Sequence, residues 1–152
     1  MLNSGFLKIL IMGLPGSGKT TLAIYLSEEL EEKNIKCCWL NADKIREKFN
    51  DWDFSLEGRK RQSQRMKNLS EIQGQYHDVV ICDFVCPLEQ TRTEFDADYI
   101  VYMNTIESSR FEDTNKIFEI PTKYNYQALT KDCVLHGNAI IEDLLRILDN
   151  KV

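Results

Sequence analysis

Apolar and polar residues change in blocks along the chain, and these blocks predict alternating strands and helices. Residues 79–82 and, apart from Lys8, residues 6–12 are short apolar runs, which are typical of strands buried on both faces. Residues 18–33 place leucines on one helical face and glutamates on the opposite face, which predicts an amphipathic helix. Residues 136–149 show the same period and predict the last helix of the chain.

Shorter blocks predict the remaining elements. Residues 36–40 and 99–103 are predicted strands, while a short helix that runs through residue 49 and a longer helix over residues 56–74 are predicted as well. Residues 108–126 mix charged and aromatic side chains without a period, which indicates a mobile loop or lid. Strands that alternate with helices predict a mostly parallel sheet covered on both faces, in a three-layer α/β/α fold.

The composition fits a single domain over residues 1–152. Hydrophobic residues make up 43% of the chain, which is enough for one core, and no linker or repeat divides it. No stretch approaches the roughly 20 apolar residues of a membrane span, and the first apolar run is too short for a signal peptide. We therefore expect a cytoplasmic protein without a membrane partner. The sequence leaves open whether it is a monomer or a homodimer.

Charge and cysteine content narrow the possible functions. The net charge of −5 disfavours nucleic-acid binding, which usually requires a basic face. A small anionic ligand remains possible because it needs only local positive charge. The cysteines lack the C-x-x-C spacing of zinc or redox motifs, so we expect reduced, structural thiols at Cys37, Cys38, Cys82, Cys86 and Cys133.

Polar loops follow three of the predicted strands, at residues 13–20, 41–46 and 83–87. In parallel α/β folds, ligands bind where the strands end at their carboxyl side. Because these strand ends meet at one edge of the sheet, the three loops are expected to form one site.

The loop at residues 13–20 fits the phosphate-binding pattern G-x-x-x-x-G-K-S/T at every required position. Backbone N–H groups of such a loop surround an anion, and the following helix adds its positive end. Lys19 is predicted to reach the β- and γ-phosphates of ATP, and the Thr20 hydroxyl to bind Mg²⁺. A chance glycine-rich turn is disfavoured by the strand before the loop and the helix after it. The predicted ATP-binding residues are Gly13, Pro15, Gly16, Ser17, Gly18, Lys19, Thr20 and Thr21.

Asp83 ends the apolar run at residues 79–82, which is the position of a Walker B acid beside Mg²⁺. The alternative is an ordinary aspartate at a strand end. Thr20 and Asp83 are therefore the predicted metal-binding residues.

Four motifs in a row resemble the adenylylsulfate (APS) kinase family, whose members transfer phosphate from MgATP to the 3′-hydroxyl of adenosine 5′-phosphosulfate. The family patterns are G-x-x-G-A/S-G-K-T/S-T, L-D-G-D-x-I/V-R, F-S-x-x-x-R and F-I/V-S/A-P. Their counterparts here are residues 13–21, 40–46, 54–59 and 84–87, in the same order and at similar spacing. The resemblance covers roughly half of the chain and implies a P-loop kinase fold with strand order 2-3-1-4-5.

The resemblance also implies roles for individual residues. Asp43 matches the acid beside the accepting hydroxyl, although an aspartate here could instead cap a helix. Arg46 and Arg59 match arginines that hold the acceptor's phosphosulfate end, with solvated surface arginines as the alternative. Phe54 matches an aromatic that stacks on the acceptor base, with a core phenylalanine as the alternative.

The resemblance also implies site residues whose individual roles it defines less closely. The residues Phe84, Val85 and Pro87 complete the predicted acceptor site. Arg110 is the candidate lid arginine that stabilises the transferred charge, and Arg65 is a weaker addition.

Several positions depart from the family pattern. Asn41 replaces the first acid of L-D-G-D, while Asp83 stands where relatives have a small polar residue and could restore that charge. Gln62 replaces an asparagine. The compact segment 110–118 replaces a longer basic, glycine-rich lid, which puts the acceptor's identity in doubt.

The sequence therefore predicts an ATP-dependent small-molecule kinase, most directly an APS kinase. The alternatives are a related kinase acting on another nucleotide-like hydroxyl, such as cytidine diphosphoramidate, or a non-catalytic nucleotide-binding protein. A GTPase switch is disfavoured because the chain lacks an N-K-x-D base-reading motif.

Overall fold

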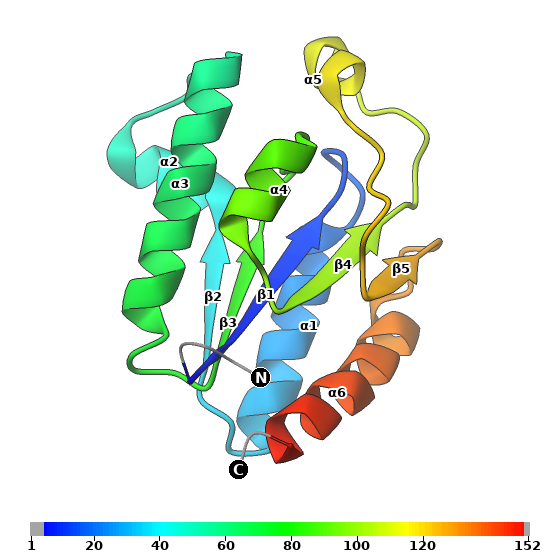
Figure 1. Cartoon of the computed structure of the whole chain (residues 1–152). Helices are drawn as coiled ribbons and strands as arrows, with labels where there is room; N and C mark the ends of the chain where they lie inside the picture. Colours follow the sequence, from blue (N-terminus) through cyan, green and yellow to red (C-terminus); the bar gives the residue numbers. More distant parts are fainter. Residues whose placement is uncertain (1–4, 151–152) are drawn as a thin grey trace.

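Five parallel strands form one sheet in the order β2-β3-β1-β4-β5 (Figure 1). The structure is a computed structural model that describes residues 5–150, so the ends of the predicted 1–152 unit lie outside the described residues. The strands are β1 (Leu7–Met12), β2 (Cys37–Asn41), β3 (Val79–Asp83), β4 (Tyr99–Met103) and β5 (Tyr126–Ala128). The predicted three-layer fold and strand order are confirmed.

The helices lie between the strands in sequence. They are α1 (Lys19–Glu32), α2 (Ala42–Phe49), α3 (Leu56–Gln73), α4 (Glu89–Phe95), α5 (Glu112–Ile117) and α6 (Cys133–Asp149). Helix α4 and strand β5 were not predicted from the sequence. Elements this short, of seven and three residues, complete too few repeats to show a period.

Helix α5 corrects the expectation that segment 110–118 lacks regular structure. Its six residues span less than two turns, too few for an amphipathic repeat. The Asn115 side chain fixes the turn before the helix, because it accepts from Ser109 N at 2.9 Å and donates to Ser109 O at 2.8 Å. Thr114 is buried, so part of α5 packs against the domain.

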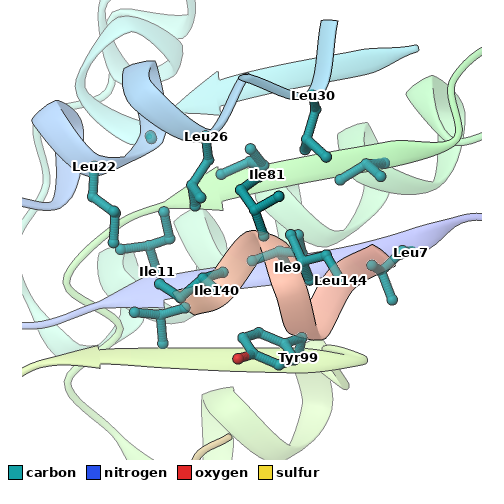
Figure 2. Close-up of a cluster of buried hydrophobic side chains, with 14 of the residues drawn as sticks. Leu7, Ile9, Ile11, Leu22, Leu26, Leu30, Ile81, Tyr99, Ile140 and Leu144 are labelled. Atoms are coloured by element: carbon teal, nitrogen blue, oxygen red, sulfur yellow. The ribbon is translucent and has the colours of Figure 1, made fainter. Parts of the chain in front are cut away.

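Helices α1 and α6 cover one face of the sheet with aliphatic side chains. Leu22, Leu26 and Leu30 follow the four-residue spacing of one helical face and point at the strands (Figure 2). Ile140 and Leu144 of α6 close the same cluster (Figure 2). Each of these side chains is fully buried, which stabilises the fold by about 1.5–3 kcal/mol per residue.

The opposite face is covered by α3 and α4 together with the loop after β3 (Figure 1). Phe84 and Phe95 meet edge to face here, with ring centroids 5.4 Å apart. Among the described residues, no helix is both long and apolar enough to cross a membrane. The carboxyl ends of the strands lie at one edge of the sheet, and α5 stands above this edge (Figure 1).

Candidate active site

The loop from β1 to α1 requires glycine at specific positions. Gly16 and Gly18 have φ angles of 84° and 101°, which residues with a Cβ rarely adopt. At Gly13, a Cβ would lie 2.7 Å from Met103 O and 2.8 Å from Ser17 Oγ. The backbone can therefore curl tightly over the start of α1, where helix N–H groups attract an anion.

Lys19 lies buried inside this loop. Its Nζ donates to Leu14 O at 3.0 Å, and only 9% of the residue is exposed. Burial lowers the pKa of Lys19 to about 8, while the nearby carboxylates of Asp83 and Asp43 act in the opposite direction. An anion bound in the loop would stabilise this poorly hydrated ammonium group.

Asp83 lies at the end of β3, in contact with the first turn of α1. Its Oδ2 accepts from Trp39 Nε1 at 2.7 Å and from Asn41 Nδ2 at 3.1 Å. Its Oδ1 lies 3.5 Å from Thr20 Oγ1. Burial raises the pKa of Asp83, whereas the hydrogen bonds from Trp39 and Asn41 oppose that rise.

The donor set at this point suits Mg²⁺. Thr20 Oγ1 and Asp83 Oδ1 are hard oxygen atoms 3.5 Å apart, near the separation of about 3 Å between adjacent ligands in an octahedral magnesium site. Mg²⁺ usually takes only one or two protein ligands and keeps several waters. Within residues 5–150, no cluster of three or more His, Cys, Asp or Glu forms another metal site.

Asn41, rather than Asp43, caps helix α2. Asn41 Oδ1 accepts from Lys44 N at 3.0 Å, the usual bond from an N-cap side chain. The capping alternative considered for Asp43 is therefore wrong. The Asp43 side chain lies in the first turn of α2 and lines the cavity described below.

Phe54 and two arginines form the wall opposite the glycine-rich loop. The guanidinium carbons of Arg46 and Arg59 lie 4.4 Å and 5.4 Å from the Phe54 ring centroid. Phe54 is 45% exposed, so the core alternative is wrong for this side chain. Arg46 and Arg59 are both buried, so the solvated-surface alternative is wrong for them as well.

Both arginines also hold the local backbone. Arg46 Nη1 donates to Asp51 O at 3.0 Å and to Asp53 O at 3.2 Å. Arg59 Nε donates to Phe54 O at 2.8 Å, and its Nη2 donates to Thr114 Oγ1 of α5 at 2.9 Å. Burial lowers the pKa of both groups, yet guanidinium stays charged at neutral pH.

A cavity of about 1200 Å³ joins the glycine-rich loop to this wall. The predicted site residues that line it are Pro15, Gly16, Gly18, Lys19, Thr20, Thr21, Asp43, Arg46, Phe54, Arg59, Asp83, Phe84, Val85, Pro87 and Arg110. Gly13 and Ser17 do not line it: Gly13 packs closely against Met103 of β4, and Ser17 is fully buried.

Arg65 and one phenylalanine of the predicted lid segment lie outside the cavity. Arg65 is paired with Asp51 at 2.9 Å and donates to Gln62 Oε1 at 2.7 Å, so it supports the wall without facing the cavity. Phe118 packs against Tyr102, with ring centroids 6.3 Å apart. Of the two phenylalanines in the predicted lid, only Phe111 reaches the cavity.

Several residues that shape the site were not predicted from the sequence. The cavity is also lined by Trp52, Ser63, Thr91, Ile106 and Lys131. Trp52 could have been suspected from its position alone, because it stands two residues before Phe54 and the F-S-x-x-x-R motif. No local signal marks the others, since they come from segments that meet only after folding.

Arg92 of α4 fixes the loop after β3. Its Nε donates to Cys86 O at 2.8 Å, and its Nη2 donates to Pro87 O at 3.0 Å. Cys86 has a φ of 46°, a left-handed conformation that needs such support. Glu119 N donates to Pro87 O at 2.8 Å, which ties the segment after α5 to the same loop.

A glycine-rich loop between a central parallel strand and a helix, with a lysine and a hydroxyl at its end, defines a P-loop α/β nucleotide-binding fold. The family model for adenylylsulphate kinase matches residues 5–118, well over half of the chain. The protein therefore belongs to the adenylylsulphate kinase family.

Individual relatives agree with this assignment. The probable adenylyl-sulfate kinase of Aeropyrum pernix is 34% identical over 83 residues, which cover 54% of this chain and 45% of that protein. The probable adenylyl-sulfate kinase of Bacillus subtilis is 34% identical over 85 residues, covering 55% and 43%. The chain spans less than half the length of these curated relatives.

Solved structures show the same fold at lower identity. The Mycobacterium tuberculosis APS kinase in complex with AMPPNP and APS has a TM-score of 0.77 at 19% identity, covering 91% of this chain and 97% of that chain. The shikimate kinase of Aquifex aeolicus has a TM-score of 0.61 at 19% identity, covering 91% and 96%.

Proposed function

We propose that the protein transfers the γ-phosphoryl group of ATP to the 3′-hydroxyl of adenosine 5′-phosphosulfate. The observation that carries this proposal is that one continuous cavity joins the P-loop lysine and hydroxyl to the Asp43–Arg46–Phe54–Arg59 wall. Its volume of about 1200 Å³ exceeds the roughly 300–1000 Å³ of a site for one drug-sized ligand. Two nucleotides could therefore meet inside it.

The loop side of the cavity would hold ATP. Backbone N–H groups of the glycine-rich loop and the Lys19 ammonium would contact the β- and γ-phosphates. Thr20 and Asp83 would hold Mg²⁺, which, when bound, neutralises phosphate charge. Phosphoryl transfer needs little covalent work from a protein, so these groups act by positioning and electrostatics.

The opposite wall would hold the acceptor. Phe54 presents an exposed ring face for an adenine base, and Arg46 and Arg59 place two positive charges beside it. Asp43 would orient the accepting hydroxyl and accept its proton. Arg110 of the proposed lid, segment 108–126, would approach the transferred group when the lid closes.

Two comparisons support the proposal. Family membership covers the P-loop and the acceptor wall. The M. tuberculosis neighbour, which shares the fold, is described in complex with AMPPNP and APS.

A panel of acceptors tests the proposal directly. ADP production would be measured with MgATP and either APS, other nucleotides or small alcohols. Turnover with APS that exceeds every other acceptor supports the proposal. Tight ATP binding without turnover on any acceptor would instead indicate a non-catalytic nucleotide-binding protein.

One observation favours a second candidate, a kinase acting on a different nucleotide-like hydroxyl such as that of cytidine diphosphoramidate. Arg46 and Arg59 already donate to backbone carbonyls and to Thr114, which leaves fewer donors for a phosphosulfate group. The family match also ends at residue 118, so β5 and α6 lie beyond it. In the acceptor panel, this candidate predicts higher turnover with cytidine diphosphoramidate than with APS.

A further inference from the structure

The two oxygens of the Asp83 carboxylate have different surroundings. Oδ2 accepts two N–H hydrogen bonds, at 2.7 Å from Trp39 Nε1 and at 3.1 Å from Asn41 Nδ2. Oδ1 has only the longer approach, 3.5 Å, to Thr20 Oγ1. The two N–H donors therefore hold Oδ2 on the sheet side and leave Oδ1 facing the P-loop.

Strand geometry explains why Trp39 reaches Asp83. In the parallel pair β2–β3, Asn41 is the direct partner of Asp83 and Trp39 is the partner of Ile81. Trp39, Asn41 and Asp83 share one face of the sheet because side chains alternate along a strand. Trp39 lies on the neighbouring strand, two residues before the direct partner of Asp83, and is therefore its diagonal neighbour. A side chain as long as that of tryptophan can span this diagonal distance.

The indole N–H is the shorter of these two contacts, and it has no competing role. The Asn41 side chain has three hydrogen-bond partners. Besides donating to Asp83, it accepts from Lys44 N as the N-cap of α2, and its Nδ2 donates to Thr20 Oγ1 at 3.3 Å. The Trp39 N–H can only donate, so it holds the carboxylate in one orientation whatever the protonation of its surroundings.

We propose that Trp39 is a positioning residue, which orients Asp83 so that Oδ1 and the Thr20 hydroxyl together receive the Mg²⁺ that accompanies ATP. The inference rests on the proposed binding of MgATP and deepens it. Trp39 does not line the cavity, so its effect passes through Asp83 rather than through contact with a nucleotide.

The alternative role for Trp39 is packing alone. Its ring lies against the α1-side core, and Lys44 Nζ sits 5.3 Å from the ring centroid. Trp39→Phe keeps most of this packing and removes the N–H. Lys44→Met is the matched control, because it removes a contact with the same ring but touches neither Asp83 nor the cavity.

The experiment measures binding of AMPPNP by calorimetry in Mg²⁺ and in EDTA. The ratio of the two dissociation constants gives the gain in affinity due to Mg²⁺. Trp39→Phe is expected to lower this gain about tenfold, the effect of losing one hydrogen bond to a charged group, and to leave the affinity in EDTA unchanged. Lys44→Met should keep the gain within about twofold of the parent.

A second background tests whether the effect passes through Asp83. In Asp83→Ser the gain in AMPPNP affinity due to Mg²⁺ should already be low. Adding Trp39→Phe to this variant should change that gain by less than about twofold. The inference is wrong if Trp39→Phe leaves the gain intact, if it lowers affinity equally in EDTA, or if it acts equally in the Asp83→Ser background. It is also wrong if the parent protein shows no gain with Mg²⁺.

Fluorescence gives a readout that keeps Trp39 in place, should Trp39→Phe fail to fold. In a Trp52→Phe background, Trp39 is the remaining tryptophan of the chain. Its emission should change when Mg²⁺ is added to the AMPPNP complex, and Asp83→Ser should abolish that change. An unchanged emission would overturn the inference. A protein that passes these tests but phosphorylates no APS would contradict the proposed acceptor and not the role of Trp39.

Discussion

Replacing Lys19 by methionine should make the nucleotide-free protein more stable while removing its activity. Lys19 is 9% exposed as a residue, and its ammonium group donates a hydrogen bond to Leu14 O at 3.0 Å. Burial lowers its pKa from 10.5 to about 8, which means that the folded state disfavours the charged form. Methionine has a similar length, fills the same space and carries no charge.

The size of the effect follows from the pKa of Lys19. Each pKa unit corresponds to about 1.4 kcal/mol, so the drop from 10.5 to about 8 corresponds to about 3 kcal/mol. At pH 7 the lysine is charged in both the folded and unfolded states, so the folded protein bears the whole free-energy cost of burying the charge. Losing the bond to Leu14 O offsets about 1–2 kcal/mol. Lys19→Met should therefore raise the free energy of unfolding by about 1–2 kcal/mol at pH 7.

The pH dependence has a defined sign. Between pH 8 and 10.5 the unfolded state binds more protons at Lys19 than the folded state, so the stability of the parent rises with pH. By a pH of about 9.5 this gain reaches about 2 kcal/mol. The methionine variant lacks this pH-dependent gain in stability. Its higher free energy of unfolding relative to the parent should therefore disappear between pH 7 and a pH of about 9.5.

Urea unfolding of the parent and the variant at neutral and alkaline pH measures the difference in their free energies of unfolding. The titration of groups that both proteins share contributes equally to the two values and cancels in this difference. Lys60→Met on the exposed face of α3 is the matched control and should change stability by less than about 0.5 kcal/mol. In the same preparations, turnover of Lys19→Met should fall by at least about 10². A variant less stable than the parent by the same amount at both pH values would refute the reasoning, and near-normal turnover would remove the P-loop lysine from the mechanism.

Three further predictions concern the acceptor side and the lid. Asp43→Ala should lower kcat by about 10² or more while ATP affinity changes little, because Asp43 is assigned to the acceptor; an equal loss of ATP binding in calorimetry would argue for a metal or structural role. Arg92→Met should lower the free energy of unfolding by about 2–4 kcal/mol in urea, because the buried Arg92 guanidinium donates to the backbone carbonyls of Cys86, Pro87 and Glu119, and a loss below about 1 kcal/mol would contradict this account. Segment 110–118 should gain protection from hydrogen exchange when an ATP analogue and acceptor bind, and Arg110→Ala should react more slowly; a segment already protected in the free protein, with a normal rate in the variant, would place the lid elsewhere.

The long, periodic elements were predictable from sequence. The apolar runs of β1, β3 and β4 and the leucine spacing of α1 each contain enough residues to show their period. Helix α5 and strand β5 are too short for that, and long-range packing holds them in place. Thr114 of α5, for example, is fixed by Arg59, which is 55 residues away in sequence.

The sequence alone determined the phosphate-binding loop, because every condition for that loop is local. Glycines at the required φ angles, a strand before them and a helix after them lie within one continuous segment. The tertiary structure decided the orientation of Asp83 and the exposure of Phe54. The Trp39–Asp83 bond joins residues 44 apart in sequence, and it depends on the register between β2 and β3. Pairing register is set by the packing of whole strands and helices, so no single segment of the sequence encodes it.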